Sequence, residues 1–197
     1  MEMTSRQRQM AEAAVRLIGE RGIARTTISA IAGAVGLTEA AFYRHFDSKA
    51  EVLTAALEYL KERGAEWMRS SAHPWVPTRL REIGEAHVSI LSSDVEMYSL
   101  PIMHFMLEDS ARAGVLTAWP SEPVAPNLRS YLEEGKAQGS IHEDLDIEAF
   151  AWQWMSWAMG EDLHFLVTRG RTAFNRLPHL RVLELMISDA ETKPGEA

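Results

Sequence analysis

Residues 26–57 read TTISAIAGAVGLTEAAFYRHFDSKAEVLTAAL, and this stretch decides the fold of the chain. Its apolar residues recur at helical spacing, and Gly36 divides them between two short helices. Thr26 or Thr27 can cap the first helix, and Thr38 can cap the second. Only a short turn around Gly36 joins the two, which is typical of a helix-turn-helix. An ordinary corner between helices has the same spacing, so the turn alone leaves both interpretations open.

Helical spacing of apolar residues continues along almost the whole chain. Ser5 can cap a first helix that Gly22 ends, and residues 48–51 (SKAE) have the pattern of a capping box. The prolines of residues 73–77 (HPWVP) interrupt the helices, and Pro101 kinks or restarts a later one. No strand-like alternation occurs, so the sequence predicts an all-α fold. After the turn, we expect helices at about residues 39–46, 49–70, 78–92, 96–113, 126–138, 147–169 and 176–189.

The composition is that of an ordinary globular protein of 197 residues, 46% hydrophobic and 24% charged, which excludes a largely disordered chain. The formal charge is −8, yet residues 1–50 hold seven basic and five acidic side chains. This uneven distribution fits a DNA-reading head on an acidic body, and chance is the alternative explanation. The absence of cysteine excludes a disulfide scaffold and thiolate chemistry. The longest uncharged apolar stretch, residues 149–160, is shorter than the about 20 residues of a membrane span. Since the N-terminus also lacks the apolar core of a secretory signal, we expect a soluble cytoplasmic protein with no membrane partner.

The stretch around the turn resembles the DNA-binding head of the tetracycline-repressor (TetR) family of bacterial regulators. The matching residues are Thr27, Ile31, Ala32, residues 34–38 (AVGLT), residues 42–46 (FYRHF), Lys49 and Leu53. The resemblance is strong over about the first quarter of the chain and looser beyond it, in the helices and in GSI followed by DLD at residues 139–146. It implies a three-helix DNA-binding domain at residues 1–48 and a helical body at residues 49–190 that binds a small molecule and forms a homodimer. Residues 191–197 are expected to be a flexible tail.

Eight residues of the head are candidate contacts with double-stranded DNA. Thr27 stands at a helix start, where a hydroxyl and free backbone amides suit a phosphate, or serve only as a cap. Glu39 can accept a hydrogen bond from cytosine N4, or is a solvated acid at a helix start. Tyr43 and His45 resemble the family's phosphate contacts, although His45 equally suits a turn cap. The full predicted set is Thr27, Thr38, Glu39, Ala40, Tyr43, Arg44, His45 and Lys49.

Dimerisation is predicted because few cations in one head face DNA, so that a single head would bind weakly. Two heads joined in a dimer would read a palindrome. Residues 147–167 are apolar on more than one face, and a partner subunit would cover the second face. The alternative is a buried central helix of a monomer. The predicted interface residues are Trp152, Ser156, Met159, Gly160 and Leu163, with Leu180, Leu183 and Ile187 of the last helix.

The chain contains ten methionines and six tryptophans, residue types that suit a pocket for a small hydrophobic effector. For any single residue, ordinary core packing is the simpler interpretation. The predicted pocket residues are Trp67, Met68, His87, Leu91, Tyr98, Met103, His104, Leu107, Trp119 and Met155. His104 and Glu108 are spaced to share a metal, but zinc needs three or four ligands, so neither a metal nor another cofactor is expected.

These observations together predict a ligand-responsive transcriptional regulator. As a repressor, it would bind a palindromic operator as a homodimer and be released by a hydrophobic effector. The helix at about residues 49–70 starts in the head and ends in the body, so we expect it to act as the lever between them. No catalytic motif occurs, and we expect no enzyme activity. The alternatives are a helical small-molecule carrier or enzyme with a purely structural helix-turn-helix, and an architectural DNA-binding protein without a ligand.

Overall fold

Two threonine caps and one glycine define the turn region in the computed structural model of the chain. Helix α2 spans Ile28–Ala34 and α3 spans Glu39–Phe42. The hydroxyls of Thr27 and Thr38 each accept a hydrogen bond from the backbone amide three residues later, both at 3.2 Å. Gly36 has φ +71°, a conformation that residues with a Cβ rarely adopt. The predicted helix-turn-helix geometry therefore follows from these local signals.

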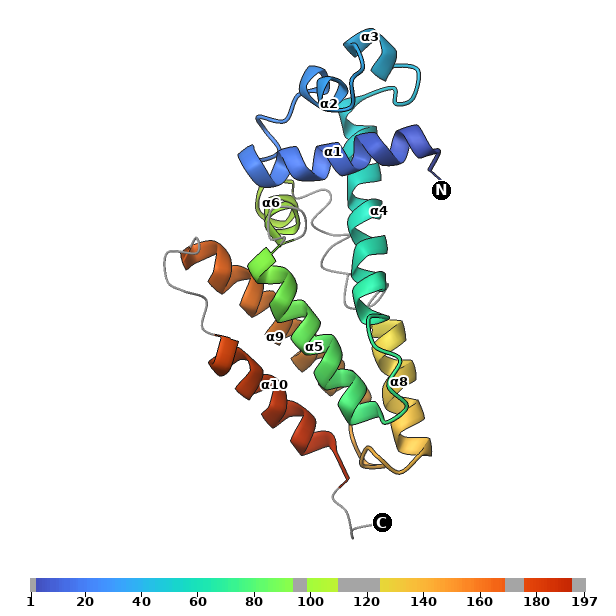
Figure 1. The fold of residues 1–197 in the computed structure, drawn as a ribbon, viewed down its shortest axis with the longest axis vertical. Helices are drawn as coiled ribbons and strands as arrows, with labels where there is room; N and C mark the ends of the chain where they lie inside the picture. Colours follow the sequence, from blue (N-terminus) through green and yellow to red (C-terminus); the bar gives the residue numbers. More distant parts are fainter. Residues whose placement is uncertain (1–2, 94–98, 110–124, 169–175, 193–197) are drawn as a thin grey trace. The chain divides into compact units, whose positions relative to one another are not determined.

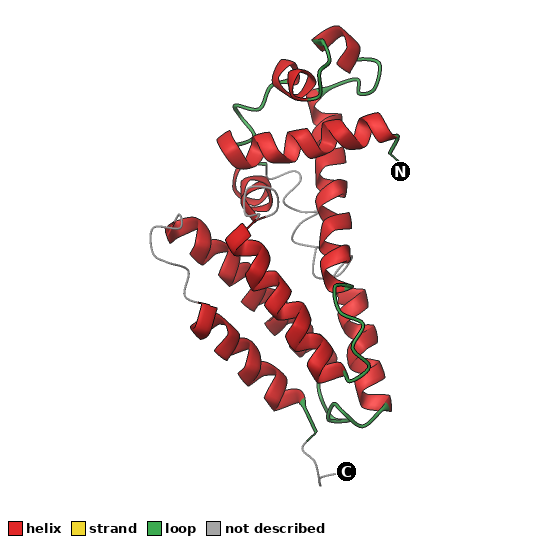
Figure 2. Cartoon of the chain, in the orientation of Figure 1, coloured by secondary structure: helices red, strands yellow, loops and turns green. Residues whose placement is uncertain are grey.

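The structure describes residues 3–93, 99–109, 125–168 and 176–192 (Figure 1). Within these ranges every regular element is a helix, and the only strand-like feature is a single bridge between Ile141 and Glu191 (Figure 2). The predicted all-α fold is thus confirmed. The other helices are α1 (Ser5–Arg21), α4 (Lys49–Met68), α5 (Val76–Ser93), α6 (Ser99–Glu108), α8 (Ala125–Ala137), α9 (Ile147–Thr168) and α10 (Arg176–Ala190).

Two caps and two helix ends differ from the sequence-based expectations, one of the ends being that of α6, which stops at Glu108 rather than near residue 113. Thr4, not Ser5, caps α1, because its hydroxyl bonds the amide of Gln7 while the Gln7 side chain returns to the Thr4 amide. Thr26 is no cap, since its buried hydroxyl donates to the Gly22 carbonyl at 2.9 Å. Helix α3 ends at Phe42 rather than near residue 46, and the chain continues in tighter turns.

Two of the prolines and the predicted capping box lie at the starts of helices. Pro77 and Pro101 both lie in the first turn of a helix, α5 and α6, where a missing backbone N–H does not interrupt the hydrogen-bond ladder. The choice between a kink and a restart at Pro101 depends on residues 94–98, which lie outside the described part. At the start of α4, the Ser48 hydroxyl accepts from the Glu51 amide at 3.2 Å, as predicted. The Glu51 carboxylate accepts from the Asp47 amide at 2.6 Å instead of returning to Ser48.

The first compact unit comprises residues 1–63 and 94–117. In its described part, α1 packs against α2 and α6, and α2 packs against α3. Its core consists of aliphatic and aromatic side chains that are nearly inaccessible to solvent. Among them are Met10, Ile18, Ile31, Phe42, Phe46 and Leu60. Phe42 and Phe46, at 0% and 1% exposed, therefore pack in the core of this unit.

The second compact unit comprises residues 64–93 and 118–197. Helices α5, α9 and α10 lie side by side, and α8 packs against α5 and α9 (Figure 1). Gly84 of α5 permits the close approach of α10, because a Cβ at this position would collide with the Leu183 side chain. Helix α4 belongs to both units, with Lys49–Arg63 in the first. The predicted functional boundary between residues 48 and 49 stays a prediction.

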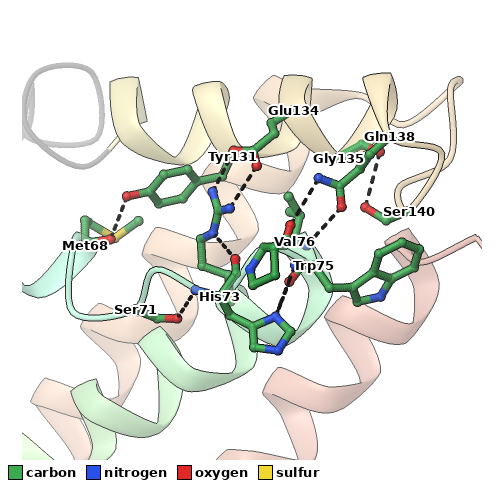
Figure 3. Close-up of polar contacts among 12 residues, drawn as sticks. Met68, Ser71, His73, Trp75, Val76, Tyr131, Glu134, Gly135, Gln138 and Ser140 are labelled. Carbon is green, nitrogen blue, oxygen red and sulfur yellow. Dashed lines mark hydrogen bonds and ion pairs between the residues drawn. The ribbon is translucent and has the colours of Figure 1, made fainter.

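A polar corner fixes the loop between α4 and α5 to α8 (Figure 3). The guanidinium of Arg79, which is 8% exposed, pairs with both carboxylate oxygens of Glu134 at 2.6 and 2.8 Å. It also donates to the His73 carbonyl at 2.7 Å and lies 4.9 Å from the centre of the Tyr131 ring. The Tyr131 hydroxyl donates to the Met68 carbonyl at 3.0 Å. Hydrogen bonding to Arg79 lowers the pKa of Glu134.

The two residues that follow α10 are paired with the loop before α9 and with α5. The Thr192 amide donates to the Ser140 carbonyl at 3.2 Å, and Arg81 donates to the Glu191 carboxylate at 2.6 Å. These two residues of the expected flexible tail are therefore held in place, while residues 193–197 lie outside the described part. Of the described helices, none is sufficiently long and apolar to cross a membrane.

Candidate functional site

The recognition surface of the head is built on the short helix α3. Phe42 and Ala41 point into the core of the first unit, so the opposite side of the helix is left to solvent. Six of the eight predicted DNA-binding residues are exposed, and Tyr43 exposes 49% of its surface. The exposed residues are Thr27, Thr38, Glu39, Ala40, Tyr43 and Arg44. They occupy the start of α2, the start of α3 and the turn after it.

His45 and Lys49 are half-buried and have structural partners. The His45 carbonyl accepts a hydrogen bond from the Gln7 side chain at 3.0 Å, which ties the end of α3 to α1. The Lys49 ammonium donates to the Ile23 carbonyl at 2.7 Å, just beyond the end of α1. These bonds hold the turn after α3 and the start of α4 against the region of α1.

The predicted effector residues do not form one group. Trp67, Met68, His87 and Met155 are buried in the second unit. Met103, His104 and Leu107 belong to α6 in the first unit, where Leu107 is 76% exposed. Tyr98 and Trp119 lie outside the described residues, as does the side chain of Leu91. Composition predicted which residue types to look for, but it could not assign them to one place.

His104 of α6 has a structural partner. Its Nδ1 lies 2.9 Å from Glu108, whose carboxylate also accepts from the Ile23 amide at 3.1 Å. Desolvation raises the pKa of Glu108, but the hydrogen bonds from His104 and the backbone outweigh it, and the net pKa is lowered. This pair fastens α6 to the end of α1. No group of three His, Asp or Glu residues able to hold a metal occurs in the part of the chain that the structure describes.

An aromatic cluster in the second unit surrounds His87. The imidazole lies 4.7 Å from the Trp67 ring and 5.6 Å from the Trp157 ring, centre to centre. Trp157 lies 5.6 Å from Trp154, which continues the cluster along α9. Trp67 is satisfied, since its Nε1 donates to the Ile83 carbonyl at 2.8 Å. The cluster joins the end of α4, the middle of α5 and the face of α9 that the helical periodicity placed inside.

The chemistry of His87 follows from its burial. Burial lowers the pKa of His87 to about 4, so the ring is neutral near pH 7. Its Nε2 lies 3.2 Å from the Ala158 carbonyl, and a carbonyl oxygen can only accept a hydrogen bond. The proton therefore sits on Nε2, and Nδ1 is left with a free lone pair.

Three polar atoms of this cluster are buried without a hydrogen-bond partner among the described residues: His87 Nδ1, Trp154 Nε1 and Trp157 Nε1. A buried polar group left unpaired costs about 1–3 kcal/mol, so native proteins keep few of them. Neither Trp154 nor Trp157 belongs to the predicted effector set, so sequence reasoning did not point to these unpaired N–H groups. The available signal was the i, i+3 spacing of two indoles on the buried stripe of α9.

The predicted dimer residues fall into two groups. Trp152, at 60% exposed, and Leu163, at 50%, project from the second unit together with Ser156 and Gly160. Val182 and Leu185 add exposed apolar surface on α10. Met159 and Leu180 are half-buried, whereas Leu183 and Ile187 are buried within the unit itself and leave no side-chain surface for a partner.

A hollow of about 740 Å³ lies on the first unit, and none of the predicted effector residues lines it. Its lining is arginine-rich, which does not match the apolar lining expected for a hydrophobic effector. The lining residues are Arg6, Gln9, Glu12, Ala13, Arg16, Ala34, Val35, Tyr59 and Arg63. We therefore place no effector there.

Comparison with known proteins identifies the class to which this geometry belongs. Residues 11–56 match the model of the bacterial regulatory proteins, tetR family. The HTH-type transcriptional regulator TtgR of Pseudomonas putida is 44% identical over 63 residues, which are 32% of this chain and 30% of TtgR. The match thus spans less than a third of this relative's length. The HTH-type transcriptional repressor KstR2 of Rhodococcus jostii is 28% identical over 155 residues, 74% of this chain and 72% of KstR2.

The fold of the whole chain has solved counterparts. The structure of SmeT with triclosan has a TM-score of 0.76 and 19% identity, and the match covers 98% of this chain and 95% of SmeT. SmeT is the repressor of the Stenotrophomonas maltophilia multidrug efflux pump SmeDEF. Residues 11–56 therefore match the family that the head predicted, and the fold of the chain is that of SmeT and similar solved structures.

Proposed function

We propose that the protein is a ligand-responsive transcriptional regulator, a repressor that binds a palindromic operator as a homodimer. The observation that carries the proposal is the exposed side of α3 in a head that matches the TetR family. The second helix of a helix-turn-helix enters the major groove, and this helix buries Phe42 while it leaves Glu39, Ala40 and Tyr43 accessible. TtgR and KstR2, which are similar to the chain, are a transcriptional regulator and a repressor.

Dimerisation would occur through α9 and α10. The exposed large apolar side chains Trp152, Leu163 and Leu185 are unusual on a surface that faces only water. Gly160 and Ser156 lie between the first two and would allow a partner helix to approach closely. A second copy of the same face would cover this surface and bring two heads to one palindrome.

Release from DNA would be a shift between two forms of the dimer. An effector held by the second unit stabilises a form of the dimer whose heads do not fit adjacent major grooves. At saturating effector, operator affinity falls by the ratio of the effector's affinities for this form and for the operator-binding form. Helix α4 runs through both units and is the proposed lever. Triclosan in the SmeT structure supports a small hydrophobic effector for this fold.

Selection from a randomised duplex library tests DNA reading. Wild-type protein is expected to enrich an inverted repeat, and a double variant, Tyr43→Ala with Arg44→Ala, is expected to lose the enrichment while it remains folded. Both side chains are exposed, so their removal leaves the core intact. If the wild type enriches no sequence, the carrier with a structural helix-turn-helix becomes the better account. If enrichment is diffuse and no hydrophobic compound raises the melting temperature of the protein, an architectural DNA-binding protein without a ligand becomes the better account.

The dimer face has its own test. Trp152→Glu places a charge in the proposed interface, and we expect sedimentation velocity to show a monomer where the wild type is a dimer. Ser130→Glu, which adds the same charge at an exposed position of α8, is the matched control and should remain dimeric. A Trp152→Glu protein that sediments as the wild type does would remove this face from the account.

A further inference from the structure

Three unpaired atoms of the second unit define a pattern of donors and acceptors. Trp154 Nε1 and Trp157 Nε1 can only donate a hydrogen bond. His87 Nδ1 carries a lone pair and accepts one, because the imidazole proton is used on the Ala158 carbonyl. The residues are 0%, 6% and 1% exposed, so bulk solvent does not satisfy these atoms. A molecule that satisfies all three must offer an acceptor to the indoles and a donor to the imidazole.

The rings around these atoms favour a flat ligand. Trp67, His87, Trp157 and Trp154 follow one another at centre-to-centre distances of 4.7, 5.6 and 5.6 Å. Aromatic partners pack at such distances in stacked or edge-to-face arrangements, so a further aromatic ring suits the same surroundings. Because these rings contact one another in sequence, the residues that carry the three unpaired atoms are neighbours.

Charge near the cluster limits the ligand further. Asp162 is 5% exposed, and one of its carboxylate oxygens lies 3.9 Å from His87 Nε2. Glu161, the preceding residue of α9, is 8% exposed and pairs with His179. Two buried carboxylates beside the site would repel an anion that has left its hydration shell. A neutral polar group is therefore favoured over a carboxylate.

We propose that the site formed by His87, Trp154 and Trp157 binds a flat aromatic effector with one small uncharged group that both donates and accepts hydrogen bonds, such as a carboxamide or a phenol. This inference rests on the proposed regulator function and names the class of its effector. The carbonyl or hydroxyl oxygen accepts from the indoles, and the N–H or O–H donates to His87. Met68 and Met155 are both buried, and they follow Trp67 and Trp154 in the sequence. Their unbranched side chains can change rotamer to admit the ring.

A series of four naphthalenes on the full-length protein tests the pattern by isothermal titration calorimetry. Naphthalene-2-carboxamide donates and accepts, 2-acetylnaphthalene only accepts, 2-ethylnaphthalene does neither, and 2-naphthoate is an anion. We expect affinity to fall about tenfold at each of the first two steps, and naphthoate to bind weakest. Equal affinities for the first three would mean that buried water serves these atoms, and would overturn the inference.

Matched tryptophan variants locate the effect. Trp157→Phe and Trp154→Phe keep an aromatic ring and remove one N–H each. Each should weaken naphthalene-2-carboxamide about tenfold while leaving 2-ethylnaphthalene unchanged. Trp75→Phe, at a 41% exposed tryptophan of the same unit, is the control and should change neither affinity. The inference fails if both cluster variants lower the affinities for the two probes equally.

Binding without DNA separates this inference from the proposed function. If an inverted repeat is enriched but no naphthalene binds, the effector class is wrong and the regulator account stands. If the carboxamide binds as expected but no duplex is enriched, the effector class stands and the DNA-reading function fails. If both occur, the carboxamide is expected to weaken operator binding by the same factor as the operator weakens carboxamide binding.

Discussion

The head and the body of this chain are both built from helices, but they place their polar side chains differently. In the first unit, short helices are set by caps and one glycine turn, and polar side chains cap helix ends or face solvent. In the second unit, long helices bury charged and polar groups, some paired across the fold and some unpaired. The exposed residues of the head, which are the predicted DNA contacts, can therefore be recognised from short-range sequence patterns. The body holds its chemistry inside, where only the three-dimensional structure reveals it.

The largest expected effect is a loss of stability caused by a substitution in the core of the head. Phe42→Ala removes a fully buried ring from α3 and should lower the free energy of unfolding by about 3–5 kcal/mol. Guanidinium titration followed by circular dichroism measures it. Tyr43→Ala, at the exposed neighbour, is the control and should change stability by less than about 0.5 kcal/mol. Comparable losses for both variants would show that α3 is not buried as described.

Acid should expose the buried histidine of the body. The pKa of His87 is about 4 in the folded protein, below its ordinary value of 6.5, so the unfolded chain takes up the proton first. The free energy of unfolding should therefore fall as the pH drops from 6.5 towards 4, by about 1.4 kcal/mol per pH unit from this residue. His87→Gln should lack this slope in urea titrations across that range. Parallel pH profiles for wild type and variant would contradict the burial of a neutral imidazole.

Loss of the polar corner should weaken the body at neutral pH. Arg79→Ala removes the bidentate pair with Glu134 and the bond to the His73 carbonyl, and should destabilise the protein by about 2 kcal/mol. The exposed partner carboxylate can regain water, which keeps the loss below that of a fully buried pair. Chemical denaturation measures it, with exposed Arg69→Ala as the control. A neutral effect would mean that the corner contributes no net stability.

The reading surface of the head should respond to salt. Arg44→Ala removes one cation per head and should weaken operator binding about threefold to tenfold, with a salt slope smaller by about two for a dimer. Fluorescence anisotropy of a labelled operator over a range of salt concentrations measures both. Arg69→Ala, at an exposed position of the second unit, should change neither. An unchanged slope in Arg44→Ala would place this residue away from the phosphates.

The smallest expected effect concerns the contact between α6 and α1. Glu108→Gln keeps an acceptor for the Ile23 amide but loses the charge beside His104, and should cost less than about 1 kcal/mol at this half-exposed site. Because the pKa of Glu108 is lowered on folding from its ordinary value of 4.5, the difference from wild type should be present at neutral pH and be lost as the pH falls below 4.5 and through the lowered pKa. Thermal unfolding with Glu20→Gln as the control checks it. A difference that persists in acid would exclude a charge effect.

Local signals explain how much of the fold was predictable. The Gly36 turn, the caps at Thr27 and Thr38 and the i, i+4 pair Phe42 and Phe46 each depend on residues close in sequence. The prediction that residues 147–167 are apolar on more than one face also agrees with the structure, since Trp154 and Ala158 of α9 are buried while Trp152 and Leu163 are exposed. The DNA-binding and interface roles of these surfaces stay predictions.

Long-range contacts explain what sequence reasoning missed. Arg79 and Glu134 are 55 residues apart, and Arg81 and Glu184 are 103 apart, so no local pattern links them. The effector prediction relied on residue type alone and drew residues from both units. The unpaired indoles of α9 became recognisable only when the fold showed which N–H groups lack an acceptor.

The central claim is that a head with few cations reads DNA only when the body pairs it with a second head. Affinity for a full inverted repeat and for a single half-site, measured by fluorescence anisotropy at one salt concentration, tests this most directly. The account predicts that the wild type prefers the full repeat by about a hundredfold or more, and that Trp152→Glu loses this preference. Equal affinity of the wild type for the two duplexes would contradict it.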